Sequence, residues 1–122
     1  MASIDIVGDE VVITIEGADK LWALKSRLSV PLHNVRGATA DPGIVKDPKG
    51  WRGPGTHVPG VLVAGTFHQN GEKIFWDVHG GDEAVVIELQ GHHYARLVIE
   101  VNDASDTVRR IEQALTALRA TG

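Results

Sequence analysis

The stretch from residue 61 to residue 101 consists of apolar runs separated by short glycine-containing turns, and this pattern limits the chain to a β-rich fold. Asn70-Gly71 is the strongest short-range signal for a hairpin, because both residues accept the positive φ of a two-residue turn. With that turn, the cross-strand pairs on one face are all apolar or glycine: Phe67 with Ile74, Gly65 with Trp76, and Val63 with Val78. We expect this face to point into the core, with Gly65 leaving room for the ring of Trp76.

Two further glycine turns predict that the strands after this hairpin continue as an antiparallel meander. A turn at Gly80-Gly81 places the next strand beside the hairpin. The core pairs across these two strands are then Trp76 with Val85 and Ile74 with Ile87. The following turn is predicted to be the three-residue loop Gly91-His92-His93, because a two-residue loop would set Arg96 against a core isoleucine and turn every side chain over. The resulting pairs are Ile87 with Leu97, Val85 with Ile99, and Glu88 with Arg96, the last of opposite charge and worth roughly 0.2–1 kcal/mol.

The first part of the chain predicts another hairpin and then shorter elements. A turn at Gly8-Asp9 places five apolar residues on one face: Ile4, Ile6, Val11, Ile13 and Ile15. The apolar spacing then becomes mixed, and we expect a short helix over about 18–25, followed by strands over about 27–31 and 35–40. Pro31 should lie at a strand end or edge, because it cannot donate a ladder hydrogen bond.

The C-terminal segment has the periodicity of an amphipathic helix. Its apolar residues recur at intervals of three and four, which places them on one face: Val108, Ile111, Leu115 and Leu118. Asn102 or Asp103 can cap the helix at its start. We expect a helix over 103–120 whose apolar face covers one mouth of the sheet.

Composition narrows the class of protein. A chain of 122 residues has the usual size of one domain, and we expect residues 1–122 to form a single one. It has no cysteine and a formal charge of −4, so it lacks disulfides and the clustered basic charge of a dedicated nucleic-acid binder. No run approaches the roughly 20 apolar residues of a membrane-spanning helix. We therefore expect a cytoplasmic protein without a membrane span, a nucleic-acid partner or a cofactor.

Four segments resemble those of a group of uncharacterised bacterial proteins with a pleckstrin-homology-like (PH-like) domain. They are Arg27–Leu32, Pro54–Gly60, Ala64–Phe67 and Phe75–Val78. The resemblance implies a β-barrel or sandwich of two near-orthogonal sheets, here with about seven to eight antiparallel strands, capped at one end by the last helix. Eukaryotic members often bind phosphoinositides through basic residues in the first hairpin loop. That loop is acidic in this chain (Gly8-Asp9-Glu10), so phosphoinositide binding is not implied.

Residues 41–60 contain four prolines and five glycines and are predicted to form a long connection without regular structure. Connections of this length are usually functional or disordered. Lys49, Arg52 and His57 supply cationic donors, and Trp51 supplies a flat apolar surface. Two interpretations stay open: a structural flap that closes the open edge of the barrel, or a surface that binds a small anion, a peptide or a protein partner.

In the predicted register, Phe75, Val86 and Val98 lie side by side on the outer face of the meander. Adjacent exposed apolar side chains commonly mark a contact surface, and the pair Glu88 and Arg96 would give this stripe a polar edge. We therefore expect the stripe to be a self-association surface and the protein to be a homo-oligomer. The alternative is that the 41–60 segment folds over it.

The candidates for catalysis or metal binding are weaker. Among the six histidines, His79 has an acidic neighbour on the same face of its strand, Asp77, but no third ligand follows, so no metal site is predicted. No serine has the surroundings of an activated nucleophile. We therefore favour a non-catalytic interaction or scaffolding module over an enzyme. The alternative is a small-ligand-binding or hydrolytic protein that uses the 41–60 segment with Asp77 and His79.

Overall fold

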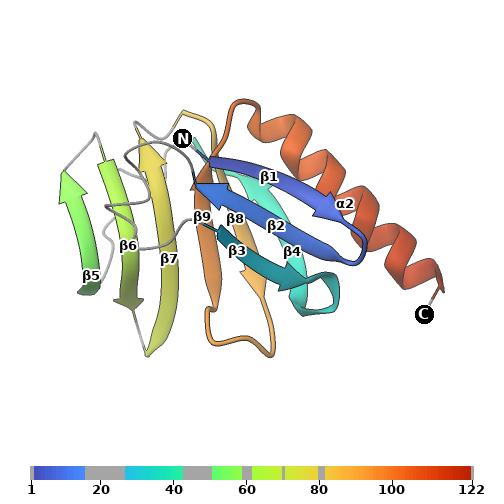
Figure 1. Cartoon of the computed structure of the whole chain (residues 1–122), viewed down its shortest axis with the longest axis horizontal. Coiled ribbons are helices and arrows are strands. Elements are labelled where there is room, and N and C mark those ends of the chain that lie inside the picture. The colour runs from blue at the N-terminus through green and yellow to red at the C-terminus, as the bar shows by residue number, and fades with distance from the viewer. Residues whose placement is uncertain are drawn as a thin grey trace.

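The computed structural model arranges the chain as two β-sheets and a C-terminal helix (Figure 1), and it describes residues 2–15, 27–42, 51–58, 62–69, 71–79 and 82–121. The strands are β1 (Ala2–Val7), β2 (Glu10–Ile15), β3 (Arg27–Pro31), β4 (Val35–Ala40), β5 (Trp51–Val58), β6 (Leu62–Gln69), β7 (Glu72–His79), β8 (Ala84–Leu89) and β9 (Arg96–Glu100). The described helical elements are the 3-10 turn η1 (Leu32–Asn34) and the helix α2 (Ala104–Thr121). One sheet has the strand order β1-β2-β3 and the other β4-β8-β9-β7-β6-β5. The predicted fold class, mainly β with a C-terminal helix, is confirmed.

Two of the three predicted hairpins with two-residue turns are confirmed, β1–β2 and β6–β7. β1 and β2 pair in the predicted register, with Ile4 opposite Ile13, and β6 and β7 do so along their whole length. Gly8 and Gly71 have φ values of 61° and 80°, in the left-handed region that these turns require. The helix predicted at about 18–25 lies outside the described residues.

The order of the last strands differs from the predicted meander. β8 and β9 pair antiparallel in the predicted register, with Ile87 opposite Leu97. However, β9 lies between β8 and β7 and pairs with β7 in parallel, so β7 and β8 are not neighbours. The prediction that Trp76 faces Val85 across a strand pair is therefore wrong, as is the same prediction for Ile74 and Ile87.

The reason for this order lies in the apolar content of β9. Leu97, Val98 and Ile99 are consecutive, and each is at most 1% exposed, so β9 is buried on both faces. A strand that is apolar on both faces is typical of the interior of a sheet that is covered on both sides. The interior position gives β9 a neighbour on each side, whereas the predicted meander would have paired it with β8 alone.

The parallel pairing divides the apolar side chains of β7 between two cores. Phe75 lies beside Leu97 in the main core, which the six-stranded sheet forms with β1, β2, β3 and α2. Trp76 lies beside Val98 on the opposite face, where its ring meets Phe67 edge to face at a centroid distance of 6.2 Å. This second cluster consists of Phe67, Ile74, Trp76, Val78, Ala84 and Val98. Trp76 is buried as predicted, but on the face opposite to the one expected.

The prediction of a twenty-residue connection at 41–60 is wrong, because β5 occupies residues 51–58 of it. β5 is the edge strand of the larger sheet and pairs antiparallel with β6. The register shifts between Arg52 and Gly55, and Pro54 lies inside this irregularity. Proline is tolerated in sheets at edges and bulges, where its missing N–H breaks no ladder bond. β5 brings the number of described strands to nine rather than seven or eight, and the β7–β9 pair is parallel.

α2 lies along the edge strands β1 and β4 of the two sheets (Figure 1). It packs against β4, β1, β8 and η1, and the side chains of Ile111 and Leu115 are fully buried in the main core. Val108 and Leu118 are partly buried against the same core. The predicted apolar stripe is therefore confirmed as the face that packs on the sheets.

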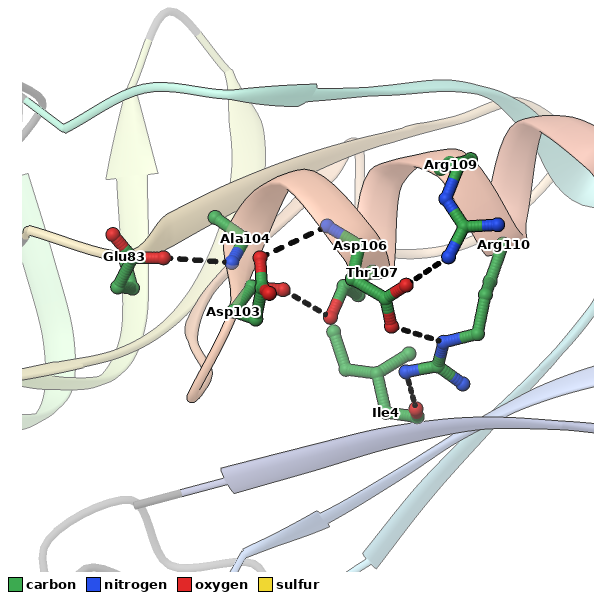
Figure 2. Close-up of polar contacts among 8 residues, drawn as sticks. All are labelled: Ile4, Glu83, Asp103, Ala104, Asp106, Thr107, Arg109 and Arg110. Carbon is green, nitrogen blue, oxygen red and sulfur yellow. Dashed lines mark hydrogen bonds and ion pairs between the residues drawn. The ribbon is translucent and has the colours of Figure 1, made fainter.

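Two carboxylates hold the first turn of α2 (Figure 2). Asp103 is the cap, because its Oδ1 accepts a hydrogen bond from the backbone N–H of Asp106 at 3.0 Å. Glu83, from the segment before β8, accepts the backbone N–H of Ala104 at 2.9 Å. Negative charge at this end of a helix is favoured by the helix dipole. Of the two predicted caps, Asn102 and Asp103, the structure selects the second.

Two arginines of α2 donate to backbone carbonyls on the edge strands. Arg110 reaches the carbonyl oxygen of Ile4 on β1 at 3.0 Å (Figure 2), and Arg119 reaches that of Arg36 on β4 at 3.3 Å. Arg110 is held by an ion pair with Asp106 at 3.2 Å. The helix thus covers one edge of each sheet both by packing and by hydrogen bonding.

Trp76→Ala should lower the free energy of unfolding by about 3–5 kcal/mol, because it removes a large buried side chain and leaves a cavity in the second cluster. Denaturant titration measures this loss. Lys73→Ala, at an exposed position of the same strand, should stay within about 0.5 kcal/mol of the unmodified protein. A loss below about 1 kcal/mol for Trp76→Ala would contradict the burial of its ring.

Asp103→Ala should lower the free energy of unfolding by about 0.5–2 kcal/mol, because the N–H of Asp106 loses its acceptor. Asp103→Asn is the matched variant, since asparagine caps helices about as well as aspartate. Urea titration of the three proteins gives the comparison. If the alanine and asparagine variants were equally destabilised, the capping role of Asp103 would be refuted.

Candidate functional site

A groove lies where η1 and β4 meet the second half of α2, and its volume is about 400 Å³. This volume falls in the range of small-ligand and side-chain pockets. We call it the α2 groove, and its lining residues are Leu32, His33, Val35, Arg36, Gln90, Leu115, Leu118 and Arg119. The leucines and the valine are buried or partly buried, whereas the histidine, glutamine and arginines are exposed. The groove therefore has an apolar floor and a polar rim.

Hydrogen bonds fix the wall of the α2 groove that η1 shares with the loop after β8. The side-chain amide of Asn34 donates to the carbonyl of Gln90 at 2.8 Å, and the N–H of Gln90 donates to the carbonyl of Asn34 at 2.8 Å. Gln90 also reaches the carbonyl of His33 at 3.4 Å. Gly91 follows with a φ of 64°, and a Cβ there would lie 3.2 Å from Nδ2 of Asn34. Glycine is thus favoured at this point by the positive φ, and a Cβ would also press on the amide of Asn34.

The rim of the α2 groove is cationic in a chain whose formal charge is −4. Arg36 and Arg119 both line it, and no carboxylate does. The described ion pairs of arginine lie elsewhere: Arg96 with Glu72, and Arg109 and Arg110 with Asp106. Arg119 uses one of its donors on the carbonyl oxygen of Arg36. The guanidinium group of Arg36 and the remaining donors of Arg119 are in no described ion pair, so they are available to a ligand that carries negative charge.

A second hollow of about 290 Å³ adjoins the α2 groove at the tip of the β1–β2 hairpin. Leu32 and Leu118 line both and form the wall between them. We call it the hairpin hollow, and its remaining lining residues are Gly8, Asp9, Ala114 and Ala117. Its surface is mostly apolar, and Asp9 is its charged residue. The two hollows therefore differ in charge while they share one wall.

The loop that follows Gln90 carries a stack of three rings. The rings of His92 and His93 stack at a centroid distance of 4.5 Å, and that of Tyr94 lies 4.6 Å from His93. The backbone N–H of Tyr94 donates to Nδ1 of His92 at 3.1 Å, so this nitrogen must be unprotonated. Burial, and then the neighbouring His93, lower the pKa of His92 below its ordinary value of 6.5.

The residues predicted to form a site in the 41–60 segment are described only in part. Lys49 lies outside the described residues, and Trp51, Arg52 and His57 are described by the backbone of β5. Their register partners on β6 are His68, Phe67 and Val63, respectively. The binding role of these four residues stays a prediction.

The predicted apolar stripe of Phe75, Val86 and Val98 is not formed. Phe75 belongs to the main core, whereas Val98 and the partly buried Val86 pack in the second cluster on the opposite face. Phe75 is 0% exposed and Val98 is 1% exposed within the single chain. The error follows from the parallel β7–β9 pairing, which turns the other face of β7 toward this side. The stripe is therefore not an exposed self-association surface.

The predicted pair Asp77 and His79 lies at the end of β7. Asp77 is on the same face as Phe75, beside Ile99, and is 1% exposed. The structure describes the backbone of His79, which lies opposite Leu62 on β6. Within the described part of the chain, no three metal-ligating side chains are grouped together. A catalytic or ligand-binding role for this pair stays a prediction.

Sequence reasoning missed the residues of the α2 groove. They come from three separate segments: 32–36, residue 90 and 115–119. The apolar floor could be predicted in part, because Leu115 and Leu118 belong to the helical stripe. The position of Arg36 and Arg119 on one rim could not be, because it depends on which strand α2 covers.

Comparison with known proteins gives one similarity. No family model matches the chain, and no solved structure matches it. The chain is 32% identical over 82 residues to the cilia- and flagella-associated protein 74 of Chlamydomonas reinhardtii. The match covers 66% of this chain and 4% of that protein, so the chain spans only a small part of its relative. Among the described helices, none combines the length and hydropathy of a membrane span.

Protonation of His92 should make the stability of the protein depend on pH. Its pKa in the folded protein is below 6.5, so below that pH the unfolded state binds more protons, and the free energy of unfolding falls as the pH is lowered from about 7.5 to about 5.5. His92→Asn keeps an acceptor for the N–H of Tyr94 but does not titrate. Urea titrations at several pH values should therefore show a shallower slope for this variant, and an unchanged slope would contradict the prediction.

Proposed function

We propose that this chain is a non-catalytic interaction module that docks a segment of a partner protein in the α2 groove. The observation that carries this proposal is the combination of a buried apolar floor with two exposed arginines that are not engaged in the described ion pairs. Interfaces typically combine such an apolar centre with a polar, solvent-accessible rim. Arginine is also among the residues most enriched where binding energy is concentrated.

The rigidity of the groove supports the same proposal. Its floor is part of the main core, and its η1 wall is tied to Gln90 by hydrogen bonds in both directions. A surface that is ordered before binding loses less conformational entropy when a partner docks. The groove therefore has the properties of a preformed docking site.

The similarity to cilia- and flagella-associated protein 74 also favours a module. The matched region is 4% of that protein, so the similarity is confined to a short part of a much longer chain, as expected of a module. We further propose that the unit is of PH-like type, that it acts in the cytoplasm, and that the partner is another protein or a second copy of this chain. A PH-like relative with the same strand order would also contain the parallel pair of β7 and β9.

Site-specific photocrosslinking tests the proposed function. A photoreactive phenylalanine analogue replaces Gln90, which lines the groove, or Ser105, which is exposed on the first turn of α2. In cells of the source organism, we expect the first position to give a discrete crosslinked product and the second to give none. The mass of the product separates a second copy of the chain from another protein.

A matched pair of tryptophan substitutions serves as the control for this experiment. Arg36→Trp places a bulky side chain in the groove itself, and Thr39→Trp adds the same side chain at an exposed position of β4 that lines neither hollow. The crosslink at position 90 should be lost in the first variant and kept in the second. Identical products from positions 90 and 105, or no product at either, would refute the proposed function.

A further inference from the structure

We infer that the partner segment is acidic and carries an apolar anchor. Its carboxylates face Arg36 and Arg119 on the α2 groove, and its anchor fills the hairpin hollow. This inference rests on the proposed function. It adds the chemistry of the segment that docks and the hollow that each of its parts enters. Each part follows from a separate property of the two hollows.

The acidic part follows from the charges that line the α2 groove. Arg36 and Arg119 contribute two full positive charges, and the lining contains no carboxylate. The C-terminal end of α2 lies nearby and carries about half a negative charge from the helix dipole. The carboxylate of Glu112 on α2 also lies close to β4, with its Oε2 3.9 Å from the position that a Cβ would take at Gly37. Two guanidinium charges exceed this charge and the half charge of the helix end together, so the groove remains attractive to an anion. Guanidinium groups also bind carboxylates through paired hydrogen bonds.

The apolar anchor follows from the lining of the hairpin hollow. Ala114 and Ala117 leave space between the helix and the hairpin tip, and Leu32 and Leu118 close the sides. Asp9 is the charged residue of this hollow, and it repels a second carboxylate. An acidic side chain is therefore favoured in the α2 groove and disfavoured in the hairpin hollow. This difference sets which part of the segment enters which hollow.

The separation of the two hollows sets the spacing within the partner. The hairpin hollow is lined by Ala114 and Ala117 and the α2 groove by Leu115 and Arg119, so the two hollows lie on either side of Leu118 and are offset by about one residue around the helix. An extended segment that crosses Leu118 covers about 6.6 Å in two residues, at about 3.3 Å each. The anchor and the first acidic residue should therefore be two positions apart. This spacing also puts both side chains on the same face of an extended strand.

Fluorescence anisotropy with short labelled peptides tests the inference. The probe has the sequence GSGLADEGSG, in which leucine is the anchor and an acidic residue follows two positions later, and its reversed sequence covers the other chain direction. Two control peptides each remove one property: GSGLANQGSG replaces the acids by amides, and GSGSADEGSG replaces the anchor by serine. We expect at least one direction of the probe to bind and both controls for that direction to bind about tenfold more weakly.

Charge-reversed variants of the protein give a second, independent measurement. Arg36→Glu combined with Arg119→Glu should weaken binding of the probe by about tenfold or more, whereas Lys73→Glu, an exposed charge remote from the groove, should change it less than twofold. Circular dichroism shows whether each variant is folded. The peptide controls use the unmodified protein, so they decide the question even if a variant fails to fold.

Three results would overturn the inference. They are equal binding of the acidic and amide peptides, no binding of either probe direction at about 1 mM, and binding of a ten-residue oligothymidylate as tight as that of the probe, which would assign the cations to a polyanion. Failure of the proposed function would look different, because the crosslink from position 90 would then be absent. If that crosslink persists in the doubly reversed variant, the docking function stands and the acidic partner is excluded.

Discussion

The burial of β9 between β7 and β8 is the constraint on which the rest of the structure depends. Three consecutive side chains, Leu97, Val98 and Ile99, have no access to solvent beyond 1%, and they alternate between the main core and the second cluster. This alternation requires apolar cover on both faces of the larger sheet. It also fixes which face of β7 meets the three-stranded sheet. The pairing of β8 with β4, on the other side of β8, places Gln90 beside η1 in the α2 groove.

The parts of the fold that could be predicted are those set by local chemistry. Turns such as Asn70-Gly71 and the helix cap at Asp103 need only neighbouring residues, and the register of each hairpin follows from its turn. The order of β7, β8 and β9 could not be obtained in this way, because turn signals describe the pairing of strands that are adjacent in sequence. The continuous run from Leu97 to Ile99 was the available signal, since a strand that is apolar on both faces favours the interior of a sheet.

The candidate site was less predictable than the fold for the same physical reason. Asn34 and Gln90 exchange hydrogen bonds across 56 positions of sequence, and Arg36 meets Arg119 across 83. No local pattern specifies such contacts. The predicted stripe at Phe75 shows how sensitive a surface prediction is to topology, because one change of strand neighbour moved this side chain from solvent to core. The basic and aromatic residues of the 41–60 segment were selected by composition alone, and composition does not show where side chains converge.

The arginine contacts of α2 with the edge strands have a consequence for how the chain folds during its synthesis. An uncovered strand edge presents unpaired N–H and C=O groups and can recruit another chain. Ile4 and Arg110 are separated by 106 positions, so β1 leaves the ribosome roughly 5–20 s before the helix that protects it, at translation rates of about 5–20 residues per second. Throughout that interval α2 cannot cover the edges of β1 and β4. The contacts of Arg110 and Arg119 with the two edge strands therefore form only after the helix has been made, and the edges stay open to pairing with another chain until then.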